Sequence, residues 1–269
     1  MTTGSAFLDR ITALKRESMS SISGDARRAT REAAKQNRSH AEQHSFLNAL
    51  RRTDRINIIA EVKRSSPSVG VIRNGADAVE TARIYESAGA AAISVLTESE
   101  YFKGALQDLI DVAAAVRVPL LRKDFTVDSH QIYEAAAAGA SAILLIVAAL
   151  EAPELRNLRV LAEDELGMDA LVEAHSAAEV EVALDSGATL VGINNRNLQT
   201  LEVSLETSRD LARYIIPDKV FVSESGIKTP AEIDSLKSLG YNAFLVGETL
   251  MRAANPSEAL RALATGASK

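Results

Sequence analysis

Charged and polar side chains stand at the ends of five short apolar runs in this sequence. The runs close on Glu61 and Lys63, on Lys123, on Glu173, on Asn194 and Arg196, and on Glu224-Ser225-Gly226. Side chains alternate in a strand, so Glu61 and Lys63 would share one face. If the runs are strands of one parallel barrel, all these groups converge on a single mouth. Lysines and carboxylates held together in this way are suited to general acid and base catalysis.

Two glycine-containing turns follow the last two apolar runs. They are Ser225-Gly226 and Gly247-Glu248. In an α/β barrel this is the place where a phosphate group often binds. Glycine lets backbone N–H groups approach the phosphate oxygens, and a helix N-terminus adds partial positive charge. The turns therefore predict a phosphate site, which Glu248 suits only if its side chain points away from the anion.

Eight apolar runs alternate with helical stretches along most of the chain. The runs begin at Ile56, Ala91, Val118, Ser141, Met168, Ala188, Lys219 and Asn242. Such runs, alternating with helices, are typical of parallel strands covered on both faces. Eight units match a (β/α)8 TIM barrel, whose usual size is about 250 residues. The alternative, a doubly wound open sheet, would carry a glycine-rich turn after its first strand, and the sequence holds no G-x-G-x-x-G.

Glycines also mark the expected ends of several helices. Gly89, Gly139, Gly187 and Gly240 each stand just before one of the apolar runs. This placement predicts helix C-caps.

The first 55 residues differ from the rest of the chain. They hold eleven basic and six acidic residues, a local balance of +5. Apolar residues at three- and four-residue spacings predict amphipathic helices, the second of which Ser39 would cap. We predict a helical extension over 1–55 and the barrel over 56–269, within one domain. We interpret the basic excess as a solvated helical face. The alternative is an arm that packs on an acidic body and adds positive field to an anion-binding mouth.

Composition narrows the classes of function. The formal net charge of −6 and the pI near 5.4 argue against a dedicated nucleic-acid binder. The absence of cysteine excludes disulfides, thiolate zinc sites and cysteine nucleophiles. The longest apolar run, Ala142 to Leu150, is shorter than half the ~20 residues of a membrane span. Asp9 and Arg10 interrupt the N-terminus where a signal peptide would be apolar. We expect a cytoplasmic protein.

Three other features predict no special chemistry. His40 and His44 have a spacing that metals use, but no third ligand is near and no metal is expected. His175 is expected to be a satisfied structural histidine, although it stands close enough to Glu173 to touch a substrate. Asp124 should face away from Lys123 and form a structural ion pair.

Several segments, taken together, resemble the indole-3-glycerol phosphate synthase family. They are E-V-K-R-S-S-P-S from Glu61, L-T-E-S-E-Y-F-K-G from Leu96, R-K-D-F from Arg122, L-V-E-A-H from Leu171, G-I-N-N-R-N-L from Gly192, S-E-S-G-I from Ser223 and F-L-V-G-E from Phe244. The resemblance covers almost the whole chain, including the N-terminal helices. It implies an enzyme of tryptophan biosynthesis that needs no cofactor. Such an enzyme closes the indole ring of 1-(2-carboxyphenylamino)-1-deoxyribulose 5-phosphate and releases carbon dioxide and water.

The resemblance also implies roles for individual residues. It makes Lys123 the general acid and Glu173 the general base, with Glu61, Lys63, Asn194 and Ser225 completing the catalytic set. Ser66, Pro67, Phe102 and Phe125 would surround the carboxyphenyl ring, Arg196 would lie near the sugar, and the phosphate side would hold Gly226, Leu245, Gly247 and Glu248. The chain departs from the family pattern at Val69, Asn197 and Glu248, where Lys, Asp and Ser are usual.

Elementary chemistry fits this reaction. Ring closure needs a proton for the ketone, and a desolvated lysine crowded by other cations would have a pKa lowered toward neutral. Dehydration needs a base, which a carboxylate such as Glu173 supplies. We expect a small anionic phosphate substrate, no nucleic-acid or membrane partner, and a monomer, with a homodimer as the alternative.

Three other functions fit the sequence less well. A sugar-phosphate isomerase such as phosphoribosylanthranilate isomerase relies on a cysteine, which this chain lacks. A non-catalytic phosphate sensor would not need a competent residue at every catalytic position. Nucleic-acid binding through the basic leader fits poorly with an acidic body.

Overall fold

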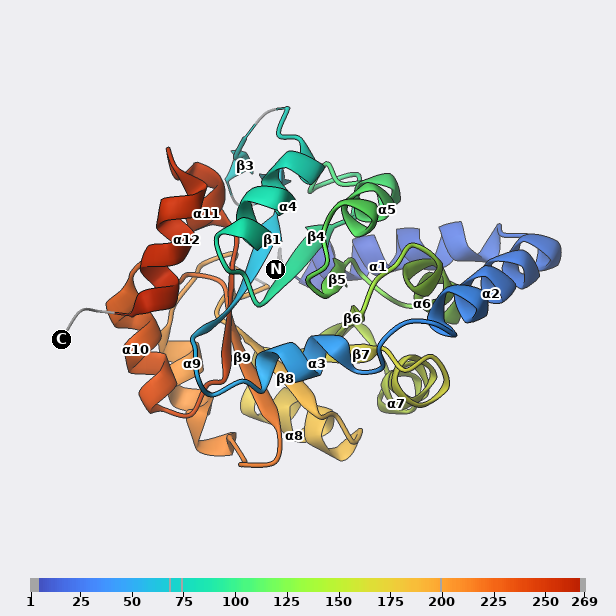
Figure 1. Cartoon of the computed structure of the whole chain (residues 1–269). Coiled ribbons are helices and arrows are strands. Elements are labelled where there is room, and N and C mark those ends of the chain that lie inside the picture. The colour runs from blue at the N-terminus through green and yellow to red at the C-terminus, as the bar shows by residue number, and fades with distance from the viewer. Residues whose placement is uncertain (1–4, 68, 74, 199, 267–269) are drawn as a thin grey trace.

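A closed barrel of parallel strands forms the centre of the computed structural model, which describes residues 5–67, 69–73, 75–198 and 200–266 (Figure 1). Eight strands of the described chain make the barrel. They are β1 (Asn57–Val62), β4 (Ala92–Leu96), β5 (Leu120–Lys123), β6 (Ala142–Ile146), β7 (Asp169–Ala174), β8 (Leu190–Asn194), β9 (Val220–Glu224) and β10 (Ala243–Val246). Each strand pairs in parallel with the next along the chain, and β1 closes the ring against β4 and β10. The predicted TIM barrel is confirmed, and each predicted apolar run contains a strand.

Strand side chains alternate between two apolar layers. Ile59, Leu121, Leu171 and Leu245 belong to the cluster that fills the barrel interior. Neighbouring residues such as Ile58 pack outward with the surrounding helices. Because both faces are buried, the strands need apolar residues at successive positions, which explains the near-continuous runs of the sequence.

Helices surround the barrel between successive strands. They are α4 (Ala78–Ser87), α5 (Leu106–Ala115), α6 (Ser129–Ala137), α7 (Ala152–Val160), α8 (Ala177–Asp185), α9 (Glu206–Leu211), α10 (Pro230–Ser238), α11 (Glu248–Arg252) and α12 (Pro256–Thr265). Short 3-10 turns lie at Val147–Ala149 and Ala212–Tyr214, a π-turn at Leu161–Glu165, and a small hairpin pairs β2 (Ser65–Ser66) with β3 (Gly70–Val71).

The predicted glycine caps are confirmed. Gly89, Gly139, Gly187 and Gly240 follow α4, α6, α8 and α10 with φ between 88° and 106°. Glycine adopts this left-handed backbone without a Cβ penalty, so the chain can leave the helix and turn toward the next strand.

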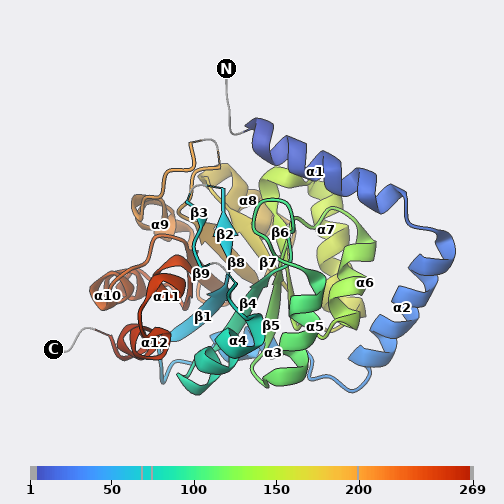
Figure 2. The same cartoon turned by 90° about the horizontal axis from the view of Figure 1, so that it is seen from above.

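The N-terminal extension lies along one side of the barrel and across its lower end (Figures 1 and 2). It contains α1 (Ser5–Ser20), α2 (Gly24–Arg38) and α3 (Ser45–Leu50). Helix α2 packs against α6, and Phe46 and Leu50 of α3 join the interior cluster of the barrel. The division into 1–55 and 56–269 stays a prediction, and its outermost residues, 1–4 and 267–269, lie outside the described part.

Basic residues of the extension form ion pairs with the barrel. Lys15 contacts Asp124 at 2.7 Å, Arg16 contacts Glu154 at 2.8 Å, and Arg27 contacts Asp128 at 2.9 Å. The interpretation as a solvated face holds for exposed residues such as Arg28 and Arg31. It does not hold for Lys15 and Arg27, which pair with acidic residues that follow β5. The packing part of the alternative is confirmed.

The predicted helix start at Ser39 is also wrong. Helix α2 continues to Arg38, so Ser39 is its C-cap and its hydroxyl donates back to the Gln36 carbonyl at 2.7 Å. Helix α3 follows His44, whose φ of 52° reverses the chain without a side-chain cap.

Helices long and apolar enough to span a bilayer do not occur in the described ranges.

Candidate active site

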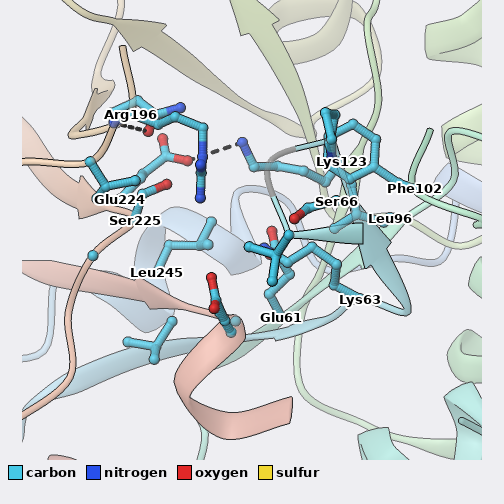
Figure 3. Close-up of a pocket in the computed structure, with 18 of the residues that line it drawn as sticks. Glu61, Lys63, Ser66, Leu96, Phe102, Lys123, Arg196, Glu224, Ser225 and Leu245 are labelled. Atoms are coloured by element: carbon cyan, nitrogen blue, oxygen red, sulfur yellow. Dashed lines mark hydrogen bonds and ion pairs between the residues drawn. The ribbon is translucent and has the colours of Figure 1, made fainter. Parts of the chain in front are cut away.

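A cavity of about 910 Å³ opens at the carboxyl ends of the strands (Figure 3). It is lined by every residue for which the family resemblance implies a catalytic or binding role: Glu61, Lys63, Ser66, Pro67, Phe102, Lys123, Phe125, Glu173, Asn194, Arg196, Ser225, Gly226, Leu245, Gly247 and Glu248. The barrel closure brings together side chains from positions almost 190 apart in the sequence. The predicted convergence on one mouth is confirmed, and the individual roles stay predictions.

Lys123 lies at the centre of the charged floor of this cavity. Its Nζ is 2.7 Å from Glu173 Oε2 and 3.0 Å from Glu224 Oε2, and its side chain is only 12 % exposed. Burial alone would lower the pKa of Lys123, but the charges of Glu173, Glu224 and Glu61 outweigh it and raise that pKa. The expected crowding by cations is wrong, because the nearest charged groups are carboxylates.

Glu173 ends the inward row of β7 and is held by donors on several sides. Its Oε2 accepts from Lys123, and its Oε1 accepts from Asn194 Nδ2 at 3.0 Å. Burial tends to raise the pKa of Glu173, yet Lys123 and His175 outweigh burial and lower it. The site therefore places a charged ammonium beside an ionised carboxylate, which are the protonation states that an acid and a base require.

Glu224 is a site residue to which sequence reasoning gave no role. It is the last residue of β9, is 1 % exposed, and points toward the Lys123 amine (Figure 3). Burial raises the pKa of Glu224 to about 7, with Lys123 opposing and Glu173 adding to the rise. A Cβ on Gly192 of β8 would collide with Glu224 Oε1, so glycine makes the space for this carboxylate.

One feature of the sequence could have indicated Glu224. It stands at the end of an apolar run, as Lys123 does at the end of another run. The sequence did not show whether Glu224 or Ser225 faces inward. The backbone answers this, because Ser225 leaves the extended conformation with φ 68° and both residues reach the cavity.

Glu61 and Lys63 share one face of the first strand end, as predicted. Lys63 Nζ lies 2.6 Å from Glu61 Oε1. Gly247, at the end of β10, packs directly against Glu61, and a Cβ there would collide with Glu61 Oε1. Gly247 is therefore a steric requirement for the position of Glu61.

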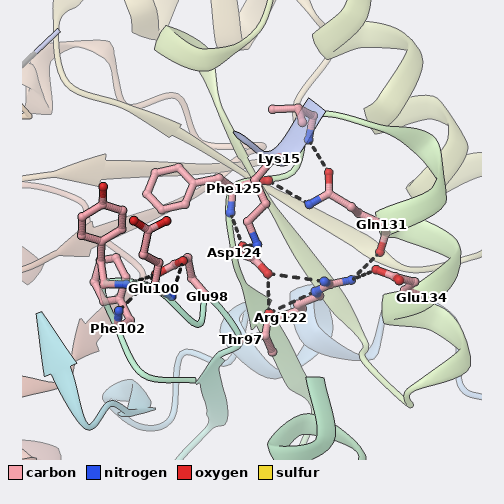
Figure 4. A network of polar contacts seen from close by, with 12 residues as sticks. Lys15, Thr97, Glu98, Glu100, Phe102, Arg122, Asp124, Phe125, Gln131 and Glu134 are labelled. Carbon is pink, nitrogen blue, oxygen red and sulfur yellow. Dashed lines mark hydrogen bonds and ion pairs between the residues drawn. The ribbon is translucent and has the colours of Figure 1, made fainter. Parts of the chain in front are cut away.

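Aromatic rings form one wall of the cavity. Phe102 and Phe125 have centroids 6.4 Å apart, and Phe7 of α1 packs edge-on against Phe125 at 6.2 Å. The place of Phe7 in the wall depends on how α1 docks, which no motif of the sequence indicates. The buried Glu98 carboxylate accepts the backbone N–H groups of residues 100–102 and fixes the loop that carries Phe102 (Figure 4).

Asp124 follows β5 at the edge of the cavity and forms a structural network (Figure 4). Its carboxylate lies 2.7 Å from Lys15 Nζ, accepts from Thr97 Oγ1 at 2.7 Å, and contacts Arg122 at 3.3 Å. The predicted structural ion pair of Asp124 is confirmed. This network ties α1, which carries Phe7, to the strand that carries Lys123.

The predicted phosphate edge has a strained backbone held by a buried amide. Ser225 and Gly226 have φ of 68° and 84°. Asn195 Nδ2 donates to the carbonyls of Glu224 and Ser225, each at 3.0 Å, and thereby keeps this turn in place. Glu248 lines the cavity, and its carboxylate accepts from Arg252 Nε at 3.0 Å.

Metal ligands do not gather anywhere in the described residues, where no three His, Cys, Asp or Glu side chains are grouped to hold an ion. His44, one of the spaced pair, instead contacts Asp169 at 3.0 Å through Nδ1.

Comparison with known proteins gives a consistent result. The family model described as indole-3-glycerol phosphate synthase matches residues 8–263. The chain is 45 % identical over 259 residues to an indole-3-glycerol phosphate synthase of Burkholderia ambifaria, covering 95 % of this chain and 98 % of that one. It is 44 % identical over 262 residues to the enzyme of that name from Aromatoleum aromaticum, covering 96 % and 99 %.

Two solved structures share the fold at low sequence identity. One is KGPDC from Streptococcus mutans, with a TM-score of 0.59 and 16 % identity over 78 % of this chain and 95 % of that one. The other is thiamine phosphate pyrophosphorylase from Pyrococcus furiosus, with a TM-score of 0.56 and 17 % identity over 77 % and 93 %. At these identities the likeness shows the barrel alone.

Proposed function

The chain belongs to the indole-3-glycerol phosphate synthase family, the carboxy-lyases of tryptophan biosynthesis, and on that premise we propose its substrate and its catalytic residues. The proposed substrate is 1-(2-carboxyphenylamino)-1-deoxyribulose 5-phosphate. The products are indole-3-glycerol phosphate, carbon dioxide and water.

Lys123 is the proposed general acid. When the ring carbon that bears the carboxylate attacks the ketone carbon, the ketone oxygen gains charge and takes a proton from the ammonium of Lys123. Carbon dioxide then leaves from the ring carbon, and the electron pair of the broken bond returns to the ring. The support for this role is the 2.7 Å contact between Lys123 Nζ and Glu173 Oε2 on a buried cavity floor, which keeps the lysine charged before reaction.

Glu173 is the proposed general base for the dehydration. Loss of water forms the double bond of the indole ring, and a proton must leave the substrate in that step. Glu173 is ionised in the free site because Lys123 and His175 lower its pKa. Glu224 is the second carboxylate that holds Lys123 protonated, from the opposite strand β9.

The remaining walls match the remaining parts of this substrate. The rings of Phe102 and Phe125, with Ser66 and Pro67, suit the carboxyphenyl group, and Glu61, Lys63, Asn194 and Arg196 suit the sugar chain and the reacting centre. The turn at Ser225 and Gly226, with Leu245, Gly247 and Glu248, is the proposed phosphate side. Aromatisation of the ring drives the loss of carbon dioxide, so the proposal includes no cofactor.

We propose a single anionic phosphate substrate as the partner of this site, with no nucleic acid or membrane, and a monomer as the working form. The net charge of −6 supports the absence of a nucleic-acid partner, because a polyanion would be repelled by the acidic body. A phosphorylated substrate does not cross membranes, which favours action in the cytoplasm.

The direct test is a turnover assay. Purified protein is mixed with the proposed substrate in the presence of a chelator, and the indole fluorescence of the product is followed. We expect multiple turnovers by the wild type and loss of nearly all activity in Glu173→Gln. A folded wild type that produces no indole-3-glycerol phosphate would contradict the proposed substrate.

A further inference from the structure

A histidine that is not among the cavity-lining residues contacts the proposed base. His175 follows the end of β7, and its Nε2 lies 3.3 Å from Glu173 Oε1. Its other ring nitrogen, Nδ1, lies 3.1 Å from Glu179 Oε2. The His175 side chain is 11 % exposed and is absent from the cavity lining. Its contact with the proposed catalytic groups is the one with Glu173.

The positions of the two carboxylates determine the charge of this ring. A neutral imidazole carries one N–H donor and one lone pair, so with carboxylate oxygens on both sides it would direct a lone pair at one of them. The imidazolium carries N–H groups on both nitrogens and is the form that this arrangement stabilises. Burial would lower the pKa of His175, but the two flanking carboxylates raise it to about 9.

Glu179 holds the imidazole ring of His175 in place. It stands on the first turn of α8, and the same Oε2 that contacts Nδ1 also accepts the backbone N–H of His175 at 2.9 Å. Ser176 Oγ contacts Glu179 Oε1 at 3.3 Å. Both oxygens of the Glu179 carboxylate therefore have partners, and this carboxylate in turn orients the His175 ring.

We propose that His175, held by Glu179, is a positioning residue that orients Glu173 and keeps it ionised for the reaction. The inference rests on the proposed function, in which Glu173 is the base. Lys123 on β5, Glu224 on β9 and Glu61 on β1 are the other charged groups that act on this cluster. Of these, Lys123 contacts Oε2, whereas His175 contacts Oε1, so the two cations bind opposite oxygens of one carboxylate.

The experiment compares four variants with the wild type in kcat, KM and their pH dependence. They are Glu173→Gln, His175→Gln, Glu179→Gln and, as a matched control, His44→Gln. His44 makes the same type of contact with Asp169, the first residue of β7, whereas Glu173 and His175 lie at the other end of that strand. His44→Gln therefore removes a histidine–carboxylate pair without touching the proposed base.

We expect His175→Gln to lower kcat by about 10- to 100-fold, the usual effect of losing a charge-assisted contact, with KM changed less than about threefold. Glu179→Gln should preserve activity near pH 7 better than near pH 9. The reason is that the ring, having lost one flanking charge, deprotonates at a lower pH, so the alkaline decline of kcat moves to lower pH by about one unit. His44→Gln should keep the wild-type pH profile.

Two results would overturn the inference. One is a kcat within twofold of wild type in His175→Gln together with an unshifted alkaline decline in Glu179→Gln. The other is an equal loss in the His44→Gln control, which would indicate a structural effect. Failure of the proposed function is recognised separately, because the wild type would then show no turnover of the proposed substrate or Glu173→Gln would retain activity. If His175→Gln does not fold, the pH profile of Glu179→Gln decides alone.

Discussion

Lys123 Nζ lies 2.7 Å from Glu173 Oε2, so the proposed acid and the proposed base form an ion pair across the floor of the barrel. Each partner shifts the pKa of the other in the direction that stabilises the pair. A substrate that reacts with Lys123 or Glu173 must displace the contact between them.

Lys123→Ala should lose about 10²- to 10⁴-fold in turnover, because loss of a general acid typically has that effect. Steady-state kinetics with the indole fluorescence assay measures the change. Lys237→Ala is the control, since Lys237 is an exposed lysine of α10 that lies outside the cavity lining. Near-normal turnover by a folded Lys123→Ala protein would remove the lysine from the mechanism.

Glu224→Gln should abolish an ionisation in the pH profile of kcat/KM. The pKa of Glu224 is raised to about 7, and its ionised form supports the charge on Lys123. Wild-type kcat/KM should therefore fall as pH drops through about 7, whereas the variant should show a lower value without this step. The loss at pH 8 should be about 10- to 100-fold, as expected for a contact of about 1.5–3 kcal/mol to a charged group.

The control for Glu224→Gln is Glu163→Gln. Glu163 is also buried with a raised pKa, but it lies in the π-turn after α7 and contacts Arg159. Its replacement should change stability and leave the pH profile intact. A profile identical for wild type and Glu224→Gln would show that another group titrates.

Gly247→Ala should displace Glu61 and reduce activity. A Cβ at this position collides with the Glu61 carboxylate, which pairs with Lys63 in the cavity. We expect kcat/KM to fall by at least about tenfold, since a shift of a working group by 1 Å can lose 10²-fold. Gly24→Ala is the matched control, because nothing lies within 4 Å of a Cβ there and its φ is not positive. Equal activity of the two variants would contradict the steric argument.

Lys15→Met should destabilise the protein in a pH-dependent manner. Burial tends to raise the pKa of Asp124, but Arg122 and Lys15 outweigh it and lower that pKa. A carboxyl whose folded pKa is depressed contributes stability above its unfolded value of about 3.9 and loses it as pH falls through the folded value. We expect Lys15→Met to lower the free energy of unfolding by about 2 kcal/mol at pH 7. The difference between the variant and the wild type should become smaller as pH falls below about 4.

Urea unfolding at several pH values measures this effect. Arg10→Met is the control, because Arg10 and Glu100 are 68 % and 49 % exposed and 3.8 Å apart. Such surface pairs contribute less than about 1 kcal/mol. A Lys15→Met loss that stays constant down to pH 3 would mean that the ion pair with Asp124 is not its cause.

The sequence by itself determined the barrel and most of the cavity. Apolar runs such as Ile143 to Val147 can be buried on both faces only in a sheet covered by helices, so their number and spacing predicted the fold. Polar residues at the ends of those runs, such as Lys123 and Glu173, had to meet because parallel strands end at the same rim. Both inferences need only local pattern and a general rule of barrels.

Other features of the site depend on which groups face each other across the barrel, and only the three-dimensional structure reveals them. The pKa of Lys123 is raised and not lowered, because Glu173 and Glu224 reach it from β7 and β9. Glu224 joins the site because the backbone turns at Ser225, and Phe7 joins it because α1 docks on β5 through Lys15. Charge interactions depend on distances between strands, and no spacing along the chain encodes those distances.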